Sequence, residues 1–336
     1  EYVRFENERV AEMIDIVRQH SGREHILFII DEVGQYVGSR SNLILNLDGL
    51  AKNLRSIGDG KVWVIGTDQQ TLTEDDPNAA LNSPELYKLK DRFPIQVNLQ
   101  SRDIKEITGE RLLDKSAAGA NRLGKLFDQH GQQLRHNIKL EDAPAYESEL
   151  DRKTFIDLYP FLPAHFDILL QMLAVLAKST GGIGLRSAIK VIQDILIEGT
   201  HGTPAATQEV GWLANAVTIY DTLSGDIETA FPSIYRSVEK VTISRYPKSP
   251  MHQAVAKTVA LLQILNNMPV TRQNVSSLLQ LNVSAESQRT AVEAAVEDLL
   301  TDTHVPFGET EGDLVFFSET LNDINVERAD IPLRSI

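Results

Sequence analysis

The apolar positions of residues 1–100 change their period along the chain, which predicts alternating helices and strands. Apolar residues recur every three or four positions over 2–19 and over 43–57, as in amphipathic helices. An uninterrupted apolar run occupies 26–30, a second strand is predicted at 61–68 with an apolar core at 62–66, and a third short strand is predicted at 95–99. Runs without polar alternation are typical of strands that are buried on both faces of a parallel sheet. Residues 1–100 are therefore predicted to form a partial α/β core in which the first two strands are parallel neighbours.

Residues 101–336 carry mainly the helical period, and the pattern divides them into three parts. Residues 101–200 are predicted to form a helical domain, with an acidic break at 141–151. Residues 201–250 are predicted to be a helical connector. Residues 251–336 are predicted to be a winged-helix-like domain, with helices at 251–266, 271–279 and 285–302 and a hairpin at 304–307 and 314–317.

The charge and the cysteine content of the sequence limit which partners the protein can bind and which cellular compartment it can occupy. The formal net charge is −14, and the absence of cysteine excludes disulfides and cysteine-ligated zinc. Residues 251–336 hold five Lys or Arg against twelve Asp or Glu, so this region favours protein contact over DNA contact. The longest apolar segment, 166–177, is too short to span a bilayer, and no basic, hydrophobic leader opens the sequence. We expect a cytoplasmic protein without membrane contact.

Two adjacent acids, Asp31 and Glu32, end the apolar strand of residues 26–30. Open α/β sheets bind ligands at the carboxyl ends of their strands, so this is the layout of a Walker B element. In that role Asp31 holds the Mg²⁺ of a bound ATP, and Glu32 polarises the water that attacks the γ-phosphate. The structural alternative is a strand that runs into an acidic surface turn.

Further polar residues follow in the order of an AAA+ ATPase. Thr67 or Asp68 ends the neighbouring strand, at the position of a sensor-1 residue that contacts the γ-phosphate or the attacking water. Arg92 precedes the third strand and resembles an arginine finger, which stabilises charge on a nucleotide held by a neighbouring subunit. Arg186 begins a helix and matches the sensor-2 arginine of a lid. The alternatives are a simple turn for Thr67 and Asp68, and surface ion pairs for the two arginines.

The phosphate-binding loop is missing from this set, because no Gly-x-x-x-x-Gly-Lys-Ser/Thr sequence occurs. The nearest string, Gly109 to Ser116, has Asp114 in place of the second glycine. A carboxylate there would repel the phosphate that backbone amides must surround, so this string is rejected. We expect the loop to precede Glu1 in a longer chain, and the sequence by itself to bind nucleotide poorly. The histidines show no metal-ligand spacing and most of them are expected at the surface, and no Gly-x-Ser-x-Gly motif marks a serine hydrolase.

Four stretches carry a resemblance to a known family. They are the strings at 28–38, 46–50 and 60–67, and Tyr-Pro-Phe-Leu-Pro at 159–163; Asp-Glu-Val-Gly-Gln at 31–35 is the most distinctive. Together they resemble the large P-loop ATPase of BREX phage-defence systems, the BrxC/PglY family, over about residues 5–200. The resemblance implies an AAA+-like ATPase that acts with a DNA methyltransferase and other partners against phage DNA. It also implies the Walker B roles for Asp31 and Glu32.

The residues and the resemblance together predict the C-terminal part of an AAA+ module with a helical lid and a winged-helix-like domain. ATP and Mg²⁺ are the expected cofactors, bound between the subunits of a homo-oligomer, and the expected output is a conformational change passed to other defence proteins. In this prediction the catalytic residues are Glu32 and Arg92, the metal ligand is Asp31, and the nucleotide-binding residues are Asp31, Thr67, Asp68 and Arg186. Two alternatives stay open: a nucleotide-gated switch or scaffold of the ORC or STAND kind, and a catalytically inactive interaction module.

Overall fold

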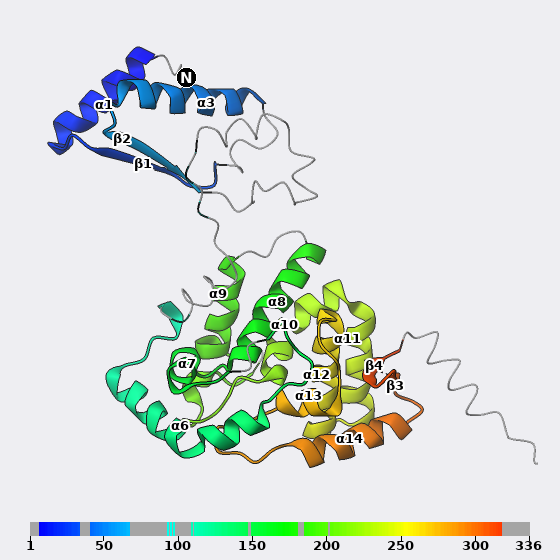
Figure 1. Cartoon of the computed structure of the whole chain (residues 1–336). Coiled ribbons are helices and arrows are strands. Elements are labelled where there is room, and N and C mark those ends of the chain that lie inside the picture. The colour runs from blue at the N-terminus through cyan, green and yellow to red at the C-terminus, as the bar shows by residue number, and fades with distance from the viewer. Residues whose placement is uncertain are drawn as a thin grey trace, which may run out of the picture. The chain divides into compact units, whose positions relative to one another are not determined.

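The computed structural model describes residues 7–33, 41–67, 111–146, 149–180, 185–200 and 202–317, together with residues 93, 95, 97 and 109. The chain divides into two compact units, residues 1–99 and residues 100–336. The first unit combines helices with a parallel strand pair, and the second is mainly helical (Figure 1).

The first unit alternates helices and strands as its sequence pattern predicts. Its elements are α1 (Asn7–Ser21), β1 (Ile26–Ile30), α3 (Ser41–Ile57) and β2 (Val62–Gly66). The two strands run parallel, in a register that pairs Ile26 with Val62 and Ile30 with Gly66. This confirms the predicted α/β class and the parallel pairing of the first two strands. The predicted third strand, at 95–99, lies largely outside the described residues.

Among the described residues, α1 and α3 pack on the same face of the β1–β2 sheet (Figure 1). The side chains of this small core are Val10, Ile14, Ile26 and Leu54, with Phe28, Leu50, Ile57, Val62 and Val64 partly buried. Successive strand residues point to opposite faces, so the other face carries the remaining apolar side chains. These side chains are between 47% and 68% exposed: Leu27, Ile29, Trp63 and Ile65. The prediction that residues 26–30 are buried on both faces is therefore wrong.

The second unit begins with helices whose first residues are capped as their sequences suggest. The helices bounded within its described residues up to 239 are α6 (Ala117–Asn137), α7 (Arg152–Leu158), α8 (Pro163–Thr180), α9 (Leu185–Gln193), α10 (Ala216–Ala230) and α11 (Pro232–Glu239). The side chains of Ser116, Asp151 and Asn215 accept hydrogen bonds from first-turn N–H groups of α6, α7 and α10. Two π-helical segments, η2 (Asp194–Glu198) and η4 (Lys240–Arg245), and a 3₁₀ helix, η3 (Ala205–Thr207), also lie in this region.

Three helices and a hairpin complete the unit in the predicted order. They are α12 (Pro250–Leu265), α13 (Arg272–Ser277), α14 (Arg289–Thr301), β3 (Phe307–Thr310) and β4 (Asp313–Phe316). The first hairpin strand was predicted at 304–307, and this is wrong. Glu311 and Gly312 both have positive φ, of 55° and 93°, which makes a tight two-residue turn and moves β3 toward it. The resulting register pairs Phe307 with Phe316, and both rings are buried.

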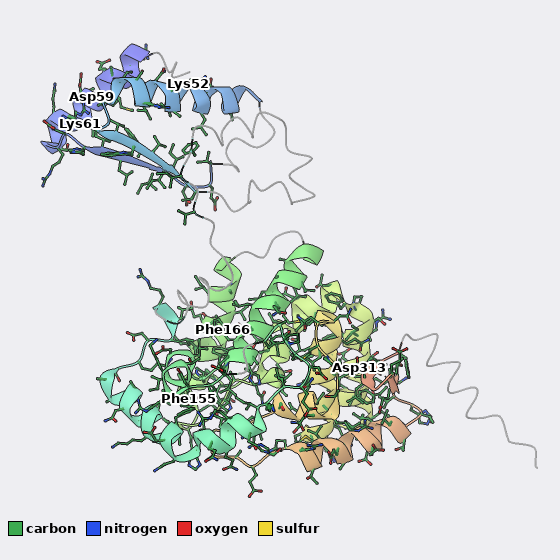
Figure 2. The ribbon with its side chains drawn as sticks, viewed as in Figure 1. Lys52, Asp59, Lys61, Phe155, Phe166 and Asp313 are labelled. Atoms are coloured by element: carbon green, nitrogen blue, oxygen red, sulfur yellow. The ribbon has the colours of Figure 1, made fainter. Side chains whose placement is uncertain are left out.

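One continuous apolar core joins the parts that the sequence pattern separates at residues 200 and 250. It extends from Leu113 through α8, α10 and α12 to Phe316, and α10 packs against both α8 and α12. Phe166 of α8 is fully buried in it, and Phe155 of α7 is fully buried in a second cluster beside α6 (Figure 2). Residues 100–336 therefore form one compact unit, and no division of the structure falls at residue 200 or 250.

The acidic segment between α6 and α7 is held against α13 by buried polar groups. The Asn274 side chain accepts the Glu141 N–H at 2.8 Å and donates to the carbonyls of Glu141 and Pro269 at 3.0 and 2.9 Å. The Ser277 hydroxyl donates to the Lys139 carbonyl at 2.8 Å. These bonds satisfy backbone groups that have no partner in a helix or strand, so they fix the path of this segment.

Candidate functional site

The carboxyl ends of β1 and β2 lie side by side, and polar residues continue both strands. The Thr67 N–H donates to the Ile30 carbonyl at 3.0 Å, and the Thr67 carbonyl accepts the Val33 N–H at 2.9 Å. These two backbone bonds carry the parallel pairing beyond the last strand residues. Thr67 is thereby fixed beside the turn that contains Asp31 and Glu32.

The Thr67 hydroxyl joins the two acids of this turn. Its Oγ1–H donates to Asp31 Oδ1, and the same oxygen accepts the Glu32 N–H at 3.1 Å. Glu32 has a φ of 52°, in the left-handed region that costs a residue with a Cβ on the order of 1 kcal/mol. Asp31 and Thr67 are exposed and Glu32 is half-buried, so a ligand can reach this edge of the sheet.

The structure thus brings together three of the six residues that the sequence singles out: Asp31, Glu32 and Thr67. Asp68 and Arg92 lie outside the described residues. Arg186 is the second residue of α9, in the other compact unit, and its side chain is also outside the described part. The catalytic and nucleotide-binding roles of all six remain predictions.

The donor set at this site fits a magnesium ion that is shared with a substrate. Within the described ranges, no group of three or more His, Cys, Asp or Glu side chains is placed to hold a metal ion. Mg²⁺ needs no such group, because it usually takes one or two carboxylates and completes its shell with water and substrate phosphates. The carboxylate of Asp31, which is oriented by the Thr67 hydroxyl, is a donor of this kind.

The rejected phosphate-loop string is held in a structural role. Lys115 Nζ donates to the Asp157 carbonyl at 3.0 Å, near the C-terminal end of α7, and Ser116 caps α6. Burial lowers the pKa of the Lys115 ammonium to about 8, although the nearby carboxylates of Asp157 and Asp114 act in the opposite direction. A lysine engaged in this way is not presented to a phosphate, which supports the rejection of this string.

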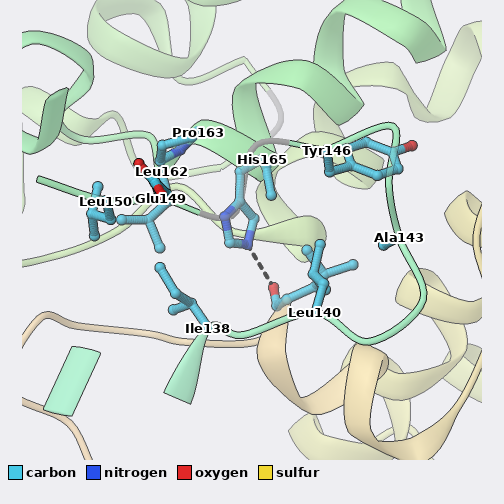
Figure 3. A pocket seen from close by; sticks show the side chains of 11 residues that line it. Ile138, Leu140, Ala143, Tyr146, Glu149, Leu150, Leu162, Pro163 and His165 are labelled. Atoms are coloured by element: carbon cyan, nitrogen blue, oxygen red, sulfur yellow. Dashed lines mark hydrogen bonds between the residues drawn. The ribbon is translucent and has the colours of Figure 1, made fainter. Parts of the chain in front are cut away.

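His165 is buried, although most of the histidines are expected at the surface. It is 1% exposed, at the start of α8, and its Nε2–H donates to the Leu278 carbonyl at 3.0 Å (Figure 3). Burial lowers the pKa of His165 to about 4, and the bond to Leu278 opposes that shift. Its Nδ1 has no hydrogen-bond partner among the described residues, and His165 lines a cavity of about 30 Å³, which is large enough to hold a water molecule.

The basic side chains of residues 251–317 are paired with neighbouring acids. Between residues 251 and 317 the Lys and Arg residues are Lys257, Arg272 and Arg289. Lys257 pairs with Asp221 at 2.6 Å, Arg272 pairs with Glu297 and Glu309 at 3.0 and 2.8 Å, and Arg289 pairs with Glu293 at 2.9 Å. Charges paired in this way are poor ligands for a nucleic-acid backbone, which strengthens the inference drawn from the charge count.

No protein-family model and no solved structure matches this chain. Among the described helices, none is by itself long and apolar enough to cross a membrane, and only the bent pair Arg152–Leu158 and Pro163–Ala177 meets that criterion together. The features of this chain that indicate a function are therefore the polar residues at the carboxyl ends of β1 and β2.

The hydroxyl of Thr67 provides a test of this geometry. In Thr67→Val the Glu32 N–H loses its acceptor and Asp31 loses a donor, so we expect local opening to become easier by about 1 kcal/mol. Thr67→Ser keeps both bonds and should behave like the wild type. Amide hydrogen exchange at Glu32 measures the difference, and equal exchange rates in the two variants would contradict the hydrogen-bonded arrangement.

Proposed function

We propose that this chain contains the Walker B portion of an AAA+-type ATPase. The observation that carries the proposal is the linked group of Asp31, Glu32 and Thr67 at the carboxyl ends of two adjacent parallel strands. Ligands of open α/β sheets bind at this edge. Asp59, Asp142 and Glu311 have similar positive φ values, so what favours a working site over a simple surface turn is the pair of hydrogen bonds made by the Thr67 hydroxyl and not the backbone of Glu32.

Each of the three residues has a distinct task in this proposal. Asp31 is the protein ligand for Mg²⁺, whose chemistry is to neutralise charge on the β- and γ-phosphates. Thr67 donates to Asp31 and thereby fixes the orientation of its carboxylate. Glu32 orients the attacking water and accepts its proton.

In this proposal the second unit, residues 100–336, serves as the lid and the output domain of the ATPase. Arg186, near the start of α9, acts as the sensor-2 residue, and Arg92 acts as the arginine finger toward a neighbouring subunit of a homo-oligomer. The paired charges of residues 251–317 favour a protein partner for this region. The resemblance to the BREX ATPase family supports a role in phage defence beside a DNA methyltransferase.

The test is ATP binding and turnover by the full-length natural protein, with Mg²⁺ and with the metal chelated. We expect turnover that requires Mg²⁺ and that Asp31→Asn abolishes. Asp15→Asn is the matched control, because Asp15 is an exposed acid on α1 in the same unit. No ATP binding, or unchanged turnover in Asp31→Asn, would overturn the ATPase proposal and favour the inactive interaction module.

A further inference from the structure

Two neighbouring residues at the start of α12 and one residue of α14, 46 positions further along the sequence, form a hydrogen-bonded chain. Ser249 Oγ lies 2.7 Å from His252 Nδ1, and His252 Nε2 lies 3.2 Å from Asp298 Oδ2 of α14. A carboxylate can only accept, so Nε2 carries the proton and donates to Asp298. This leaves His252 Nδ1 as the acceptor of the Ser249 hydroxyl proton.

The imidazole of His252 is held firmly in this orientation. The Tyr246 ring stacks on it, with a centroid distance of 4.1 Å and an angle of 5° between the planes. Tyr246 is itself tied through its hydroxyl to Asp302, at 3.3 Å, and Asp302 pairs with Arg245 at 2.8 Å. The His252 side chain is 12% exposed, whereas Asp298 is 64% exposed, so the chain of bonds runs from a sheltered base to the surface.

Ser249 is also placed beside free backbone donors. It is the residue before the first turn of α12, but its side chain caps no N–H of that helix. The N–H groups of Met251 and His252 belong to the first turn, where no intrahelical acceptor exists. Such donors, with the positive end of the 16-residue helix behind them, stabilise negative charge that develops next to the Ser249 oxygen.

From these contacts we infer that Ser249, His252 and Asp298 form an acyl-transfer site. Nucleophile, base, orienting carboxylate and oxyanion donors are all present, with the two imidazole nitrogens exchanged relative to the usual serine hydrolase arrangement. Ser249 is half-buried and borders neither of the two cavities described for this unit. The substrate class is therefore a small, unhindered ester rather than a large acyl chain.

The reaction balances with water as the only co-substrate. Ser249 Oγ bonds to the ester carbonyl carbon while its proton moves to His252 Nδ1, and the oxyanion faces the N–H groups of Met251 and His252. The carbon–oxygen bond to the leaving alcohol then breaks, and that alcohol takes the proton from Nδ1. Water repeats the sequence on the acyl-serine, which releases the carboxylic acid and returns the proton to Ser249.

The probe is p-nitrophenyl acetate, with the full chain at neutral pH and without ATP. We expect a burst of p-nitrophenolate close to one equivalent per chain, and an acetyl group on Ser249 in the acid-quenched protein. Ser249→Ala should remove both. Ser116→Ala is the matched control: it removes an N-cap hydroxyl of α6 that accepts from Gly119, outside the proposed site, and should keep the burst.

A second variant protects the test against a folding defect. Asp298 is mostly exposed, so Asp298→Asn should fold normally, yet it should slow acylation by about 10²-fold because the base loses its orienting charge. Circular dichroism and thermal unfolding verify the fold of each variant. A burst that persists in Ser249→Ala, or no acetylation of Ser249 in the wild type, would overturn the inference. The hydrogen bonds among Ser249, His252 and Asp298 would then have only a structural role at the start of α12. Neither result affects the ATPase proposal, because the acyl-transfer site and the ATPase site have no residue and no substrate in common.

Discussion

Glu32→Gln is expected to retain ATP while losing most hydrolysis. The substitution keeps the size of the side chain and leaves unchanged Asp31 and Thr67, to which the proposal assigns the metal side of the site. It removes the carboxylate that the proposal assigns as acceptor of the water's proton, and a general base typically contributes about 10²–10⁴-fold to a rate. Steady-state turnover and nucleotide retention on the full-length protein measure the two effects separately.

The control for this variant is Glu12→Gln, which changes an exposed glutamate on α1 in the same unit. It should leave turnover unchanged. Glu32→Gly adds a second contrast, because glycine adopts positive φ without strain and should relieve about 1 kcal/mol at this turn while also stopping hydrolysis. If Glu32→Gln turns over ATP at the wild-type rate, the Walker B assignment of Glu32 is wrong.

The stability of the second unit is expected to fall as the pH drops from about 6.5 to 4, because of His165. The pKa of this buried side chain is about 4 in the folded protein, against an ordinary value of 6.5. Below pH 6.5 the unfolded chain therefore binds a proton that the folded chain does not. The contribution of His165 to stability is fully present above pH 6.5 and is lost progressively as the pH falls to 4. The total loss over this range is about 3 kcal/mol, at 1.36 kcal/mol per pH unit.

Urea unfolding at several pH values measures this dependence. His165→Gln keeps an amide donor for the Leu278 carbonyl but cannot be protonated, so its stability should change much less across that range. His136→Gln, at an exposed position of α6, is the matched control and should retain the wild-type dependence. If His165→Gln loses stability with falling pH as steeply as the wild type does, the acid sensitivity has another origin.

Features that depend on residues close together in the sequence were predicted, and features that depend on contacts between distant residues were not. The helix and strand positions of the first unit were predictable, because amphipathic spacing and apolar runs report local backbone preference over 5 to 17 residues. The proximity of Thr67 to Asp31 was also predictable, because parallel neighbours bring their carboxyl ends to one edge. The β3 position was missed because the strained turn at Glu311 and Gly312 involves a non-glycine residue at positive φ, which the pattern does not mark.

The features that were missed depend on contacts between distant parts of the chain. The exposed face of β1 and β2 has the same apolar composition as the covered one, so the sequence alone could not say which face the helices leave open. The histidines gave no spacing signal, yet His165 is buried against a carbonyl 113 residues away and His252 bonds to Asp298 46 residues away. No motif search finds such pairs, because their spacing is set by helix packing.

The sequence by itself determined the α/β character of the first unit, the helical character of the second, and the acidic turn that makes Asp31 and Glu32 candidates. Each of these follows from periodicity or residue type within a short window. Only the tertiary structure decided that one core extends from Leu113 to Phe316, that His165 is buried, and that Ser249, His252 and Asp298 meet. Burial and contacts between side chains that are distant in the sequence depend on which surfaces pack together, and this packing is a property of the whole fold.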